Sequence, residues 1–264
     1  MMLIRRTAAG VVVGALAVLL VGCGGSDPAA GDAINTTPPP TTTSRTSVLP
    51  TPTPTATPTT PAADISGLSA DKILSKAQAA AKAATSVRVK GSLADGADRF
   101  VMDVRLGKTG GQGSVSVNGA GFALIVTDRT AYLKPSKQFW RAQTKSKAEA
   151  DAVLALVGNR WIKLPLTDKD LEDLLAFASK PKFFDQLFVP EGSVRKTTSR
   201  TVDGVAAIGL RASDGTLWVD RATGRPVRLE SSGTDALAFS EYNTFTTPKA
   251  PPPGQVIDGK ALGM

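Results

Sequence analysis

Ser86-Val87-Arg88-Val89-Lys90 is the stretch that decides the fold, because polar and apolar residues alternate along its whole length. Successive side chains of a β-strand point to opposite faces, so this alternation predicts a strand with one face toward a core and the other toward water. The period of two returns in residues 100–106, and two such strands so close together predict an antiparallel hairpin. The apolar members of the second strand are Phe100, Met102, Val104 and Leu106.

Eight further segments bring the predicted set to about ten antiparallel strands. Residues that favour tight turns separate them, namely Asn118-Gly119, Asp203-Gly204, Asp214-Gly215 and Ala222-Thr223-Gly224. The eight segments are residues 114–117, 122–126, 130–134, 194–202, 205–212, 216–220, 226–231 and 236–245.

Helical periodicity appears before the first strand and again in the middle of the chain. Ser69 is a suitable N-cap for an alanine-rich helix that runs to residue 84. Residues 147–157 predict a second helix, Thr167 opens a third, and residues 181–188 predict a short fourth. The proline-rich tail after residue 248 is expected to be extended. The fold class is therefore α+β, with one domain over residues 64–264 and a helical insert between two runs of strands.

The N-terminal residues have the layout of a bacterial export signal that ends at a lipid attachment point. Arg5 and Arg6 give a basic start, and residues 8–21 are uncharged and mostly apolar. This run is shorter than the roughly 20 residues that a membrane-spanning helix needs. Leu20-Val21-Gly22-Cys23 resembles the lipobox of bacterial lipoproteins, which implies cleavage before Cys23 and acylation of its thiol. We expect residues 1–22 to be a signal peptide and Cys23 to be the lipidation site. The alternative is an uncleaved transmembrane helix.

Residues 23–63 predict a disordered tether behind the lipidated cysteine. Thr and Pro supply 20 of the 26 residues between positions 36 and 61, so this stretch has little apolar surface to bury. An extended polyproline path of about 3.1 Å per residue would hold the domain up to roughly 80 Å from the membrane. A plain spacer and an O-glycosylated stalk both fit this composition.

The composition excludes several classes of site. The chain has no histidine and a single cysteine, so an internal disulfide, a Ser-His-Asp or Cys-His catalyst and the usual zinc sites cannot be built. Carboxylate pairs such as Asp128 with Asp203, or Ser-Lys pairs, stay formally open, but no spacing supports them. We therefore expect no enzyme activity, no catalytic residues, no metal and no cofactor.

The net charge of +8 falls to +6 once the two arginines of the signal are removed. Lysines and arginines are spread along the sequence rather than clustered, which argues against nucleic-acid binding. For an anchored protein, this charge favours attraction to anionic lipid or to a wall polymer.

The order of these elements resembles the LolA-like lipoprotein-carrier fold, and in particular the actinobacterial LppX/LprG lipoproteins. The resemblance is carried by the alanine-rich helix, by the strand that opens at Ser86, and by several short motifs. These motifs are Tyr132-Leu133-Lys134, Phe139-Trp140, Trp161-Ile162-Lys163-Leu164, Leu217-Trp218-Val219-Asp220, Gly224-Arg225-Pro226-Val227-Arg228-Leu229 and residues 252–258. The resemblance implies a curved antiparallel half-barrel with helices on its concave face and, in several members, an apolar cavity for acyl chains. It also implies a role in carrying lipid or lipoglycan across the cell envelope.

The candidate ligand-binding residues are the apolar strand faces and the apolar helical residues that would cover them. An ordinary closed core is the alternative, because aliphatic alternation does not distinguish a lined cavity from a filled one. On the strands the candidates are Phe100, Met102, Val104, Phe122, Leu124 and Val126, and on the helices Leu171, Leu174, Leu175, Phe183, Phe184 and Leu187.

Two roles follow from these features. The first is a lipoprotein on the extracytoplasmic face of the membrane that binds or carries an acylated lipid or lipoglycan, with an envelope export partner. The second is an envelope sensor, scaffold or assembly factor of the same fold without a lipid cavity.

Overall fold

The computed structural model describes residues 64–262, except residues 128–129, 166–179, 191 and 232. The predicted signal peptide, Cys23 and the tether therefore lie outside the described residues. The same holds for the predicted helix behind Thr167, with Leu171, Leu174 and Leu175, and for Asp128. Among the described residues, no helix has the length and apolar character needed to span a bilayer.

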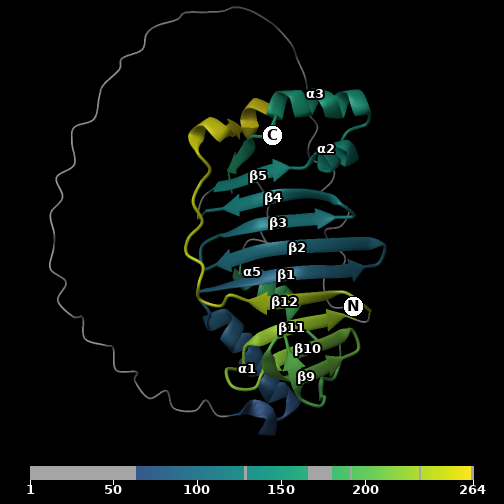
Figure 1. Cartoon of the computed structure of the whole chain (residues 1–264), viewed down its shortest axis with the longest axis vertical. Coiled ribbons are helices and arrows are strands. Elements are labelled where there is room, and N and C mark those ends of the chain that lie inside the picture. The colour runs from purple at the N-terminus through teal and green to yellow at the C-terminus, as the bar shows by residue number, and fades with distance from the viewer. Residues whose placement is uncertain (1–63, 128–129, 166–179, 191, 232, 263–264) are drawn as a thin grey trace, which may run out of the picture. The chain divides into compact units, whose positions relative to one another are not determined.

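One large sheet contains all the described strands (Figure 1). Its order is β13-β6-β5-β4-β3-β2-β1-β12-β11-β10-β9-β7, and β8 pairs with β9 beside this path. The strands are β1 Ser86–Asp95, β2 Asp98–Gly107, β3 Gly111–Val117, β4 Ala120–Val126, β5 Thr130–Pro135, β6 Trp161–Pro165, β7 Arg195–Lys196, β8 Arg200–Val202, β9 Val205–Ala212, β10 Gly215–Asp220, β11 Pro226–Ser231, β12 Ala236–Ser240 and β13 Val256–Asp258. The helices are η1 Ile65–Gly67, α1 Ala70–Ala83, α2 Lys137–Gln143, α3 Lys147–Val157, α5 Lys180–Leu187, η3 Pro253–Gln255 and η4 Gly259–Leu262.

The sheet consists of two antiparallel meanders joined side by side. Strands β1 to β6 form the first meander and β9 to β12 the second, and β12 pairs with β1 to join them. The edge strands β13 and β7 do not pair with each other, so the sheet is open, as a half-barrel requires. The predicted α+β class is confirmed.

The described residues form thirteen strands, where the sequence predicted about ten. Strands β6 and β13 were not among the predicted ones, and the predicted strand over residues 194–202 is divided into β7 and β8. The division is a shift of register against β9, because Lys196 lies opposite Leu210 whereas Arg200 lies opposite Ala207. The segment between β7 and β8 thus has one residue more than the facing segment of β9, which interrupts the ladder as a β-bulge does.

One strand pair is parallel, so the sheet is mixed rather than wholly antiparallel. Strand β13 runs beside β6 with Val256 opposite Trp161 and Ile257 opposite Ile162. The tail that the sequence predicted to be simply extended thus contains η3 and this strand.

Two of the predicted hairpin turns have the backbone that their residues favour, whereas at Asp214-Gly215 neither residue has a positive φ angle and Gly215 already belongs to β10. Asn118 and Gly119 have φ angles of 51° and 82°, and Asp203 and Gly204 have 49° and 82°. Positive φ at both central residues is the mark of a tight turn whose twist matches that of the flanking strands. These turns fix the registers of β3 with β4 and of β8 with β9.

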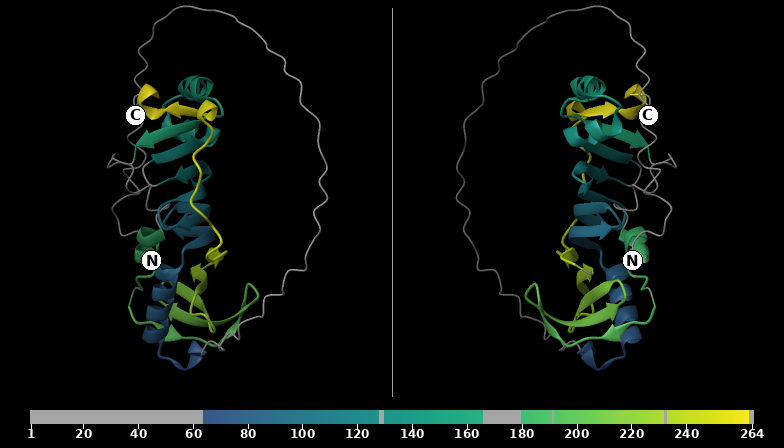
Figure 2. Two further views of the ribbon diagram at one scale, coloured as in Figure 1. Left: turned by 90° about the vertical axis from the view of Figure 1, so that its left-hand side faces the viewer. Right: turned by 90° about the vertical axis from the view of Figure 1, so that its right-hand side faces the viewer.

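Helices α1 and α5 lie on one side of the sheet (Figure 2). The Ser69 hydroxyl accepts from the Lys72 amide at 3.4 Å, which confirms the predicted N-cap of α1. The buried positions Ile73, Ala77 and Ala81 face the sheet, and the small side chains of the two alanines allow the close approach that the alanine content predicted. Helix α5 confirms the predicted short helix near residues 181–188.

The insert between β5 and β6 contains α2 and α3. Helix α3 has the bounds that the periodicity predicted, whereas α2 was not predicted. Ser136 begins α2, because its hydroxyl accepts from the Phe139 amide at 3.1 Å, and Trp140 is buried on the inner side of the helix.

Strand β12 ends at Ser240 and not at residue 245 as predicted. Glu241 and Asn243 have φ angles of 51° and 63°, which turn the chain out of the sheet. The Asn243 amide donates to the Ser86 carbonyl at 3.0 Å, and its side-chain oxygen accepts from the Thr85 amide at 2.7 Å. Residues 241–255, which we call the C-terminal strap, then pass along the ends of the strands toward β13 (Figure 1).

Candidate functional site

One face of the sheet is apolar across both meanders. A row of aligned residues crosses the first meander from β1 to β6, with Val89 opposite Val104, Gly113 opposite Leu124, and Leu133 opposite Ile162. Because side chains alternate between faces, this row and its neighbours two residues away define a single apolar face. The sequence-predicted strand residues of the candidate site all lie on it.

The first of two buried clusters lies where α1 and α5 cover this face. It brings Met102 and Val104 together with Phe183, Phe184 and Leu187. Each of these five side chains is at most 5% exposed. Two residues that were not among the candidates complete the packing: Phe188 stacks on Phe184 with ring centroids 5.1 Å apart, and Phe239 lies 5.8 Å from Phe188. The side chains of this cluster therefore fill the space under α1 and α5 themselves.

The second cluster lies under α2 and α3. It contains Leu124 and Val126 from β4 together with Trp140, Val153 and Val157 from the two helices. The predicted candidates on β4 are thus brought together with helical residues of the insert, which were not among the predicted ligand contacts.

Beside α2, the apolar face is only half-buried. Phe122 packs against both clusters, and its ring lies edge-on to Phe139 with centroids 6.0 Å apart. On the same face, Phe100 is opposite Val117 across β2 and β3. The half-buried residues Phe100, Val117, Phe122, Leu133 and Phe139 form what we call the apolar strip.

The sequence named two members of the apolar strip and missed three. Val117 and Leu133 share the alternation of their strands with named candidates, so the same signal could have included them. Phe139 entered only through the Phe139-Trp140 motif, and it lies on α2, a helix without an apolar period in the sequence, so periodicity did not assign it to the site.

The opposite face of the central strands is charged and internally paired. The Arg88 guanidinium contacts the Asp103 carboxylate at 2.7 Å and the Glu241 carboxylate at 2.7 Å, and Arg105 contacts Glu241 at 2.9 Å. Hydrogen bonds from Arg88 lower the pKa of Asp103, and those from Arg105 and Arg88 lower the pKa of Glu241. These ion pairs tie the C-terminal strap to β1 and β2.

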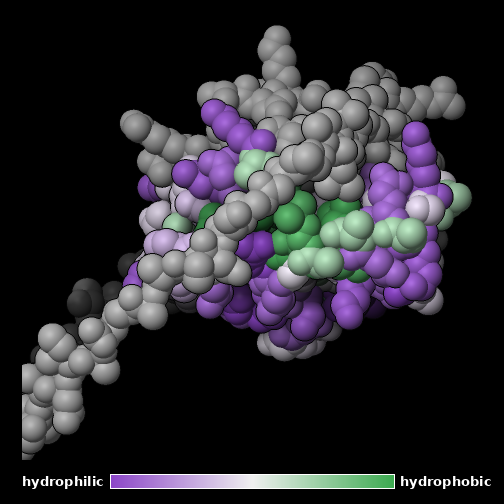
Figure 3. Space-filling model, turned by 90° about the horizontal axis from the view of Figure 1, so that it is seen from above, coloured by the Kyte–Doolittle hydropathy of each residue, from purple (hydrophilic) through white to green (hydrophobic). Residues whose placement is uncertain are grey.

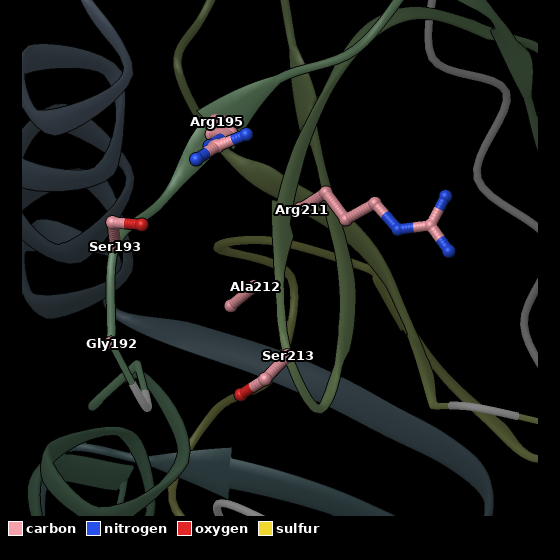
Figure 4. Close-up of a pocket in the computed structure, with 6 residues that line it drawn as sticks. All are labelled: Gly192, Ser193, Arg195, Arg211, Ala212 and Ser213. Carbon is pink, nitrogen blue, oxygen red and sulfur yellow. The ribbon is translucent and has the colours of Figure 1, made fainter.

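Two open pockets lie at the β9 end of the sheet, away from the apolar strip. The first, of about 530 Å³, is lined by Gly192, Ser193, Arg195, Arg211, Ala212 and Ser213, and the Arg211 side chain extends away from the two serines (Figure 4). The second, of about 490 Å³, lies beside Trp218, whose ring is covered by the Arg200 guanidinium at 4.0 Å. Neither pocket is lined by a residue that the sequence named for ligand binding.

The described carboxylates do not gather into a metal site. In the described part of the chain, no three His, Cys, Asp or Glu side chains gather closely enough to hold one metal ion. Asp203, one of the carboxylates considered above, pairs with the Arg228 guanidinium at 3.2 Å.

Comparisons with known proteins give structural likenesses alone. No protein-family model matches the chain, and no curated protein matches it. Among solved structures, the chain is similar to LprF from Mycobacterium bovis, with 14% identity over 68% of this chain and 96% of that chain and a TM-score of 0.43. It is similar to an uncharacterized conserved protein from Thermus thermophilus, with 14% identity over 72% and 98% of the two chains and a TM-score of 0.33.

A third likeness is to a chain of the MucA/MucB complex from Pseudomonas aeruginosa, with 16% identity over 70% of this chain and 59% of that chain and a TM-score of 0.30.

Proposed function

We propose that this chain is a bacterial lipoprotein, anchored through Cys23 on the extracytoplasmic face of the membrane, that binds or carries an acylated lipid or lipoglycan on its apolar strip. The observation that carries the proposal is the half-buried state of the apolar strip, with the rings of Phe100, Phe122 and Phe139, beside two buried apolar clusters. Large apolar side chains that are left partly open on a continuous apolar face are typical of a ligand-binding surface.

The energetics suit a carrier rather than a catalyst. An acyl chain that moves from a bilayer to an apolar protein surface stays out of water, and each CH₂ that remains buried keeps about 0.8 kcal/mol. Transfer is then close to balanced and reversible. It needs neither a covalent step nor a cofactor, which agrees with a chain that has no histidine.

The proposal narrows the site that the sequence suggested. Five of the predicted ligand contacts instead form part of an ordinary closed core under α1 and α5, whereas the apolar strip stays half-buried. The five are Met102, Val104, Phe183, Phe184 and Leu187. We therefore place the acyl chain against Phe122, with Phe100 and Phe139 on either side of it.

The test compares two substitutions on one strand that point to opposite faces. Phe122→Ser removes the centre of the apolar strip, and Ile125→Ser, on the other face of β4, is the matched control. The full chain is purified from a bacterial host, extracted with organic solvent, and its lipid content per protein is measured by mass spectrometry. Wild type and Ile125→Ser should carry about one acylated molecule beyond the anchor, and Phe122→Ser should carry much less. Equal lipid content in all three chains would overturn the proposal.

A role as an envelope sensor or scaffold is the second candidate. The tightly filled cluster under α1 and α5 favours it, since that part of the interior has no need of a ligand. Chemical crosslinking in cells separates the two, because a scaffold should give one reproducible protein partner and no bound lipid.

A further inference from the structure

The end of the molecule that carries α2 and α3 is strongly basic. Residues 134–163 hold seven lysines and arginines and two acidic residues, which gives +5 of the chain's net charge of +8. The positive charge is therefore concentrated in this segment, whereas the sequence suggested that it was spread along the chain. Lys137 and Arg141 lie one turn apart on α2, and Lys145 and Lys147 lie at the start of α3; all four are exposed.

Little of this charge is neutralised locally. Lys147 pairs with Asp151 at 2.7 Å, and no described acidic side chain forms an ion pair with Lys137, Arg141 or Lys145. The pKa of Asp151 is lowered, first by the hydrogen bond from Lys147 and then by the charges of Arg141 and Lys137. The positive charges of α2 therefore reach Asp151 on α3, and the two helices together form one basic surface.

The outer face of α3 within this basic surface is apolar. Leu156 is 42% exposed, although it is a large aliphatic side chain. Ala148, Ala152 and Ala155 are exposed on the same side, while Val153 and Val157 point inward. Figure 3, which looks onto this end, shows hydrophobic residues across its centre with hydrophilic residues on both sides. We call Leu156, the three alanines, Lys137, Arg141, Lys145 and Lys147 the basic end.

We propose that the basic end docks flat on the surface of an anionic lipid bilayer. An exposed apolar helix face flanked by lysine and arginine is the arrangement that inserts shallowly at the headgroup boundary. At about 1.5 Å per residue, the 11 residues of α3 are too short to cross a bilayer, so the helix lies in the surface plane. The positive charge of the basic end selects an anionic membrane over a neutral one, because each basic residue near an anionic membrane adds about 1 kcal/mol of attraction.

This contact is additional to the lipid at Cys23 and does not depend on whether the chain carries lipid. If the proposed function holds, docking would also place the lipid-binding surface near its source of lipid. Phe139 on α2 belongs to the apolar strip. The next residue, Trp140, is buried in the second cluster together with Val153 of α3, so the apolar strip and the basic end share helix α2. Docking through α2 and α3 would bring the apolar strip close to the bilayer.

The experiment places a polarity-sensitive fluorophore at the basic end of the full chain. Cys23→Ser frees the chain of its native thiol, and Ala152→Cys carries the probe on α3. A second chain carries the same probe at Lys72→Cys, an exposed position on α1, which lies at the other end of the sheet (Figure 1). Vesicles contain either phosphatidylcholine alone or equal parts of phosphatidylcholine and phosphatidylglycerol.

The probe at position 152 should shift to shorter wavelength on the anionic vesicles and much less on the neutral ones, while the probe at position 72 should not shift. The double variant Lys137→Gln with Arg141→Gln should need a roughly 25-fold higher concentration of anionic lipid for the same shift, since each charge contributes about fivefold to the binding constant. Lys72→Gln with Lys76→Gln, also exposed lysines, is the matched control and should change the response little.

Three results would overturn the proposal. Equal shifts on neutral and anionic vesicles would show that charge does not direct the contact. Equal shifts at positions 72 and 152 would show that the chain approaches without a preferred end. A shift at position 152 that grows with protein concentration in the absence of vesicles would make the α3 face an interface between copies of this chain.

Discussion

Lys180 closes the C-terminal end of α1, because its ammonium group donates to the carbonyl oxygen of Ala81 at 2.9 Å. It also donates to the Lys82 carbonyl at 2.7 Å, and Lys180 as a whole is 2% exposed. The last carbonyls of a helix have no partners within it, and a cation there also interacts favourably with the helix dipole. A buried lysine at the start of α5 thus holds two helices together that are far apart in sequence.

Lys180→Met should therefore destabilise the protein by about 1–3 kcal/mol, as expected when buried carbonyls lose a charged donor. Methionine keeps most of the apolar stem, so the change isolates the ammonium group. Urea unfolding followed by circular dichroism measures the loss. A midpoint equal to that of wild type would show that water replaces the ammonium group without loss.

The same lysine predicts a pH dependence with a definite sign. Burial lowers the pKa of Lys180 below its usual 10.5, so at alkaline pH the unfolded chain binds a proton that the folded chain has released. Stability should then rise with pH, relative to Lys180→Met, from the lowered folded pKa up to the ordinary value. Unfolding curves of both chains over this alkaline range test it, and a difference that is constant with pH would contradict it.

Acid should weaken the charged face of the central strands. The pKa values of Asp103 and Glu241 are lowered by their arginine partners, so their contribution is complete above the unfolded values near 4 and is lost as pH falls through the folded ones. Asp103→Asn should reduce stability at neutral pH and flatten its decline in acid. Thermal melts from pH 6 down to pH 2 measure both effects, and parallel curves for the two chains would count against the prediction.

Gly91 should be intolerant of any side chain at the seam between the two meanders. It lies opposite Leu237 across β1 and β12, its φ angle is 147°, and an added Cβ would overlap the carbonyl oxygen of Ala236. Gly91→Ala should cost about 2–3 kcal/mol through forced separation of the strands. Gly67→Ala, where a Cβ meets nothing within 4 Å, is the control and should be close to neutral in the same chemical unfolding assay.

Two substitutions of Asn243 separate the contribution of its positive φ angle from that of its side-chain hydrogen bond. Asn243→Ala loses the hydrogen bond to the Thr85 amide and also strains the positive φ angle, so it should cost about 1–2 kcal/mol. Asn243→Gly loses the hydrogen bond but accepts the backbone angle, and should fall between wild type and the alanine variant. If the glycine variant were less stable than the alanine variant, the positive φ angle would not be the controlling factor.

Local sequence patterns were sufficient to predict most of the helices, strands and turns. Strands β9 and β11 and helix α3 have the bounds that their periodicity predicted, and the turns at Asn118-Gly119 and Asp203-Gly204 have the expected backbone. In each case the signal lies within the segment itself, in the alternation, the helical period or the residues that tolerate positive φ. The apolar face could be predicted for the same reason.

The features that escaped prediction depend on partners distant in sequence. Strand β13 exists because β6 offers an edge, and the break between β7 and β8 exists because the facing segment of β9 is one residue shorter. Helix α2 has a cap at Ser136 but no apolar period, so Phe139 could not be assigned to the site. Whether Phe122 would be half-buried and Met102 fully buried depends on which helices cover each of them, and alternation carries no such information.

Strands β12 and β13, which lie on either side of the C-terminal strap, set the order in which the sheet can be completed. A chain that emerges from its N-terminus presents β1 long before β12 exists, and β6 long before β13. Strand β1 keeps an unpaired edge until residues 236–240 are available, and β6 until residues 256–258 are, and exposed edges invite mispairing with other chains. A ribosome that still holds these residues therefore keeps the sheet unfinished.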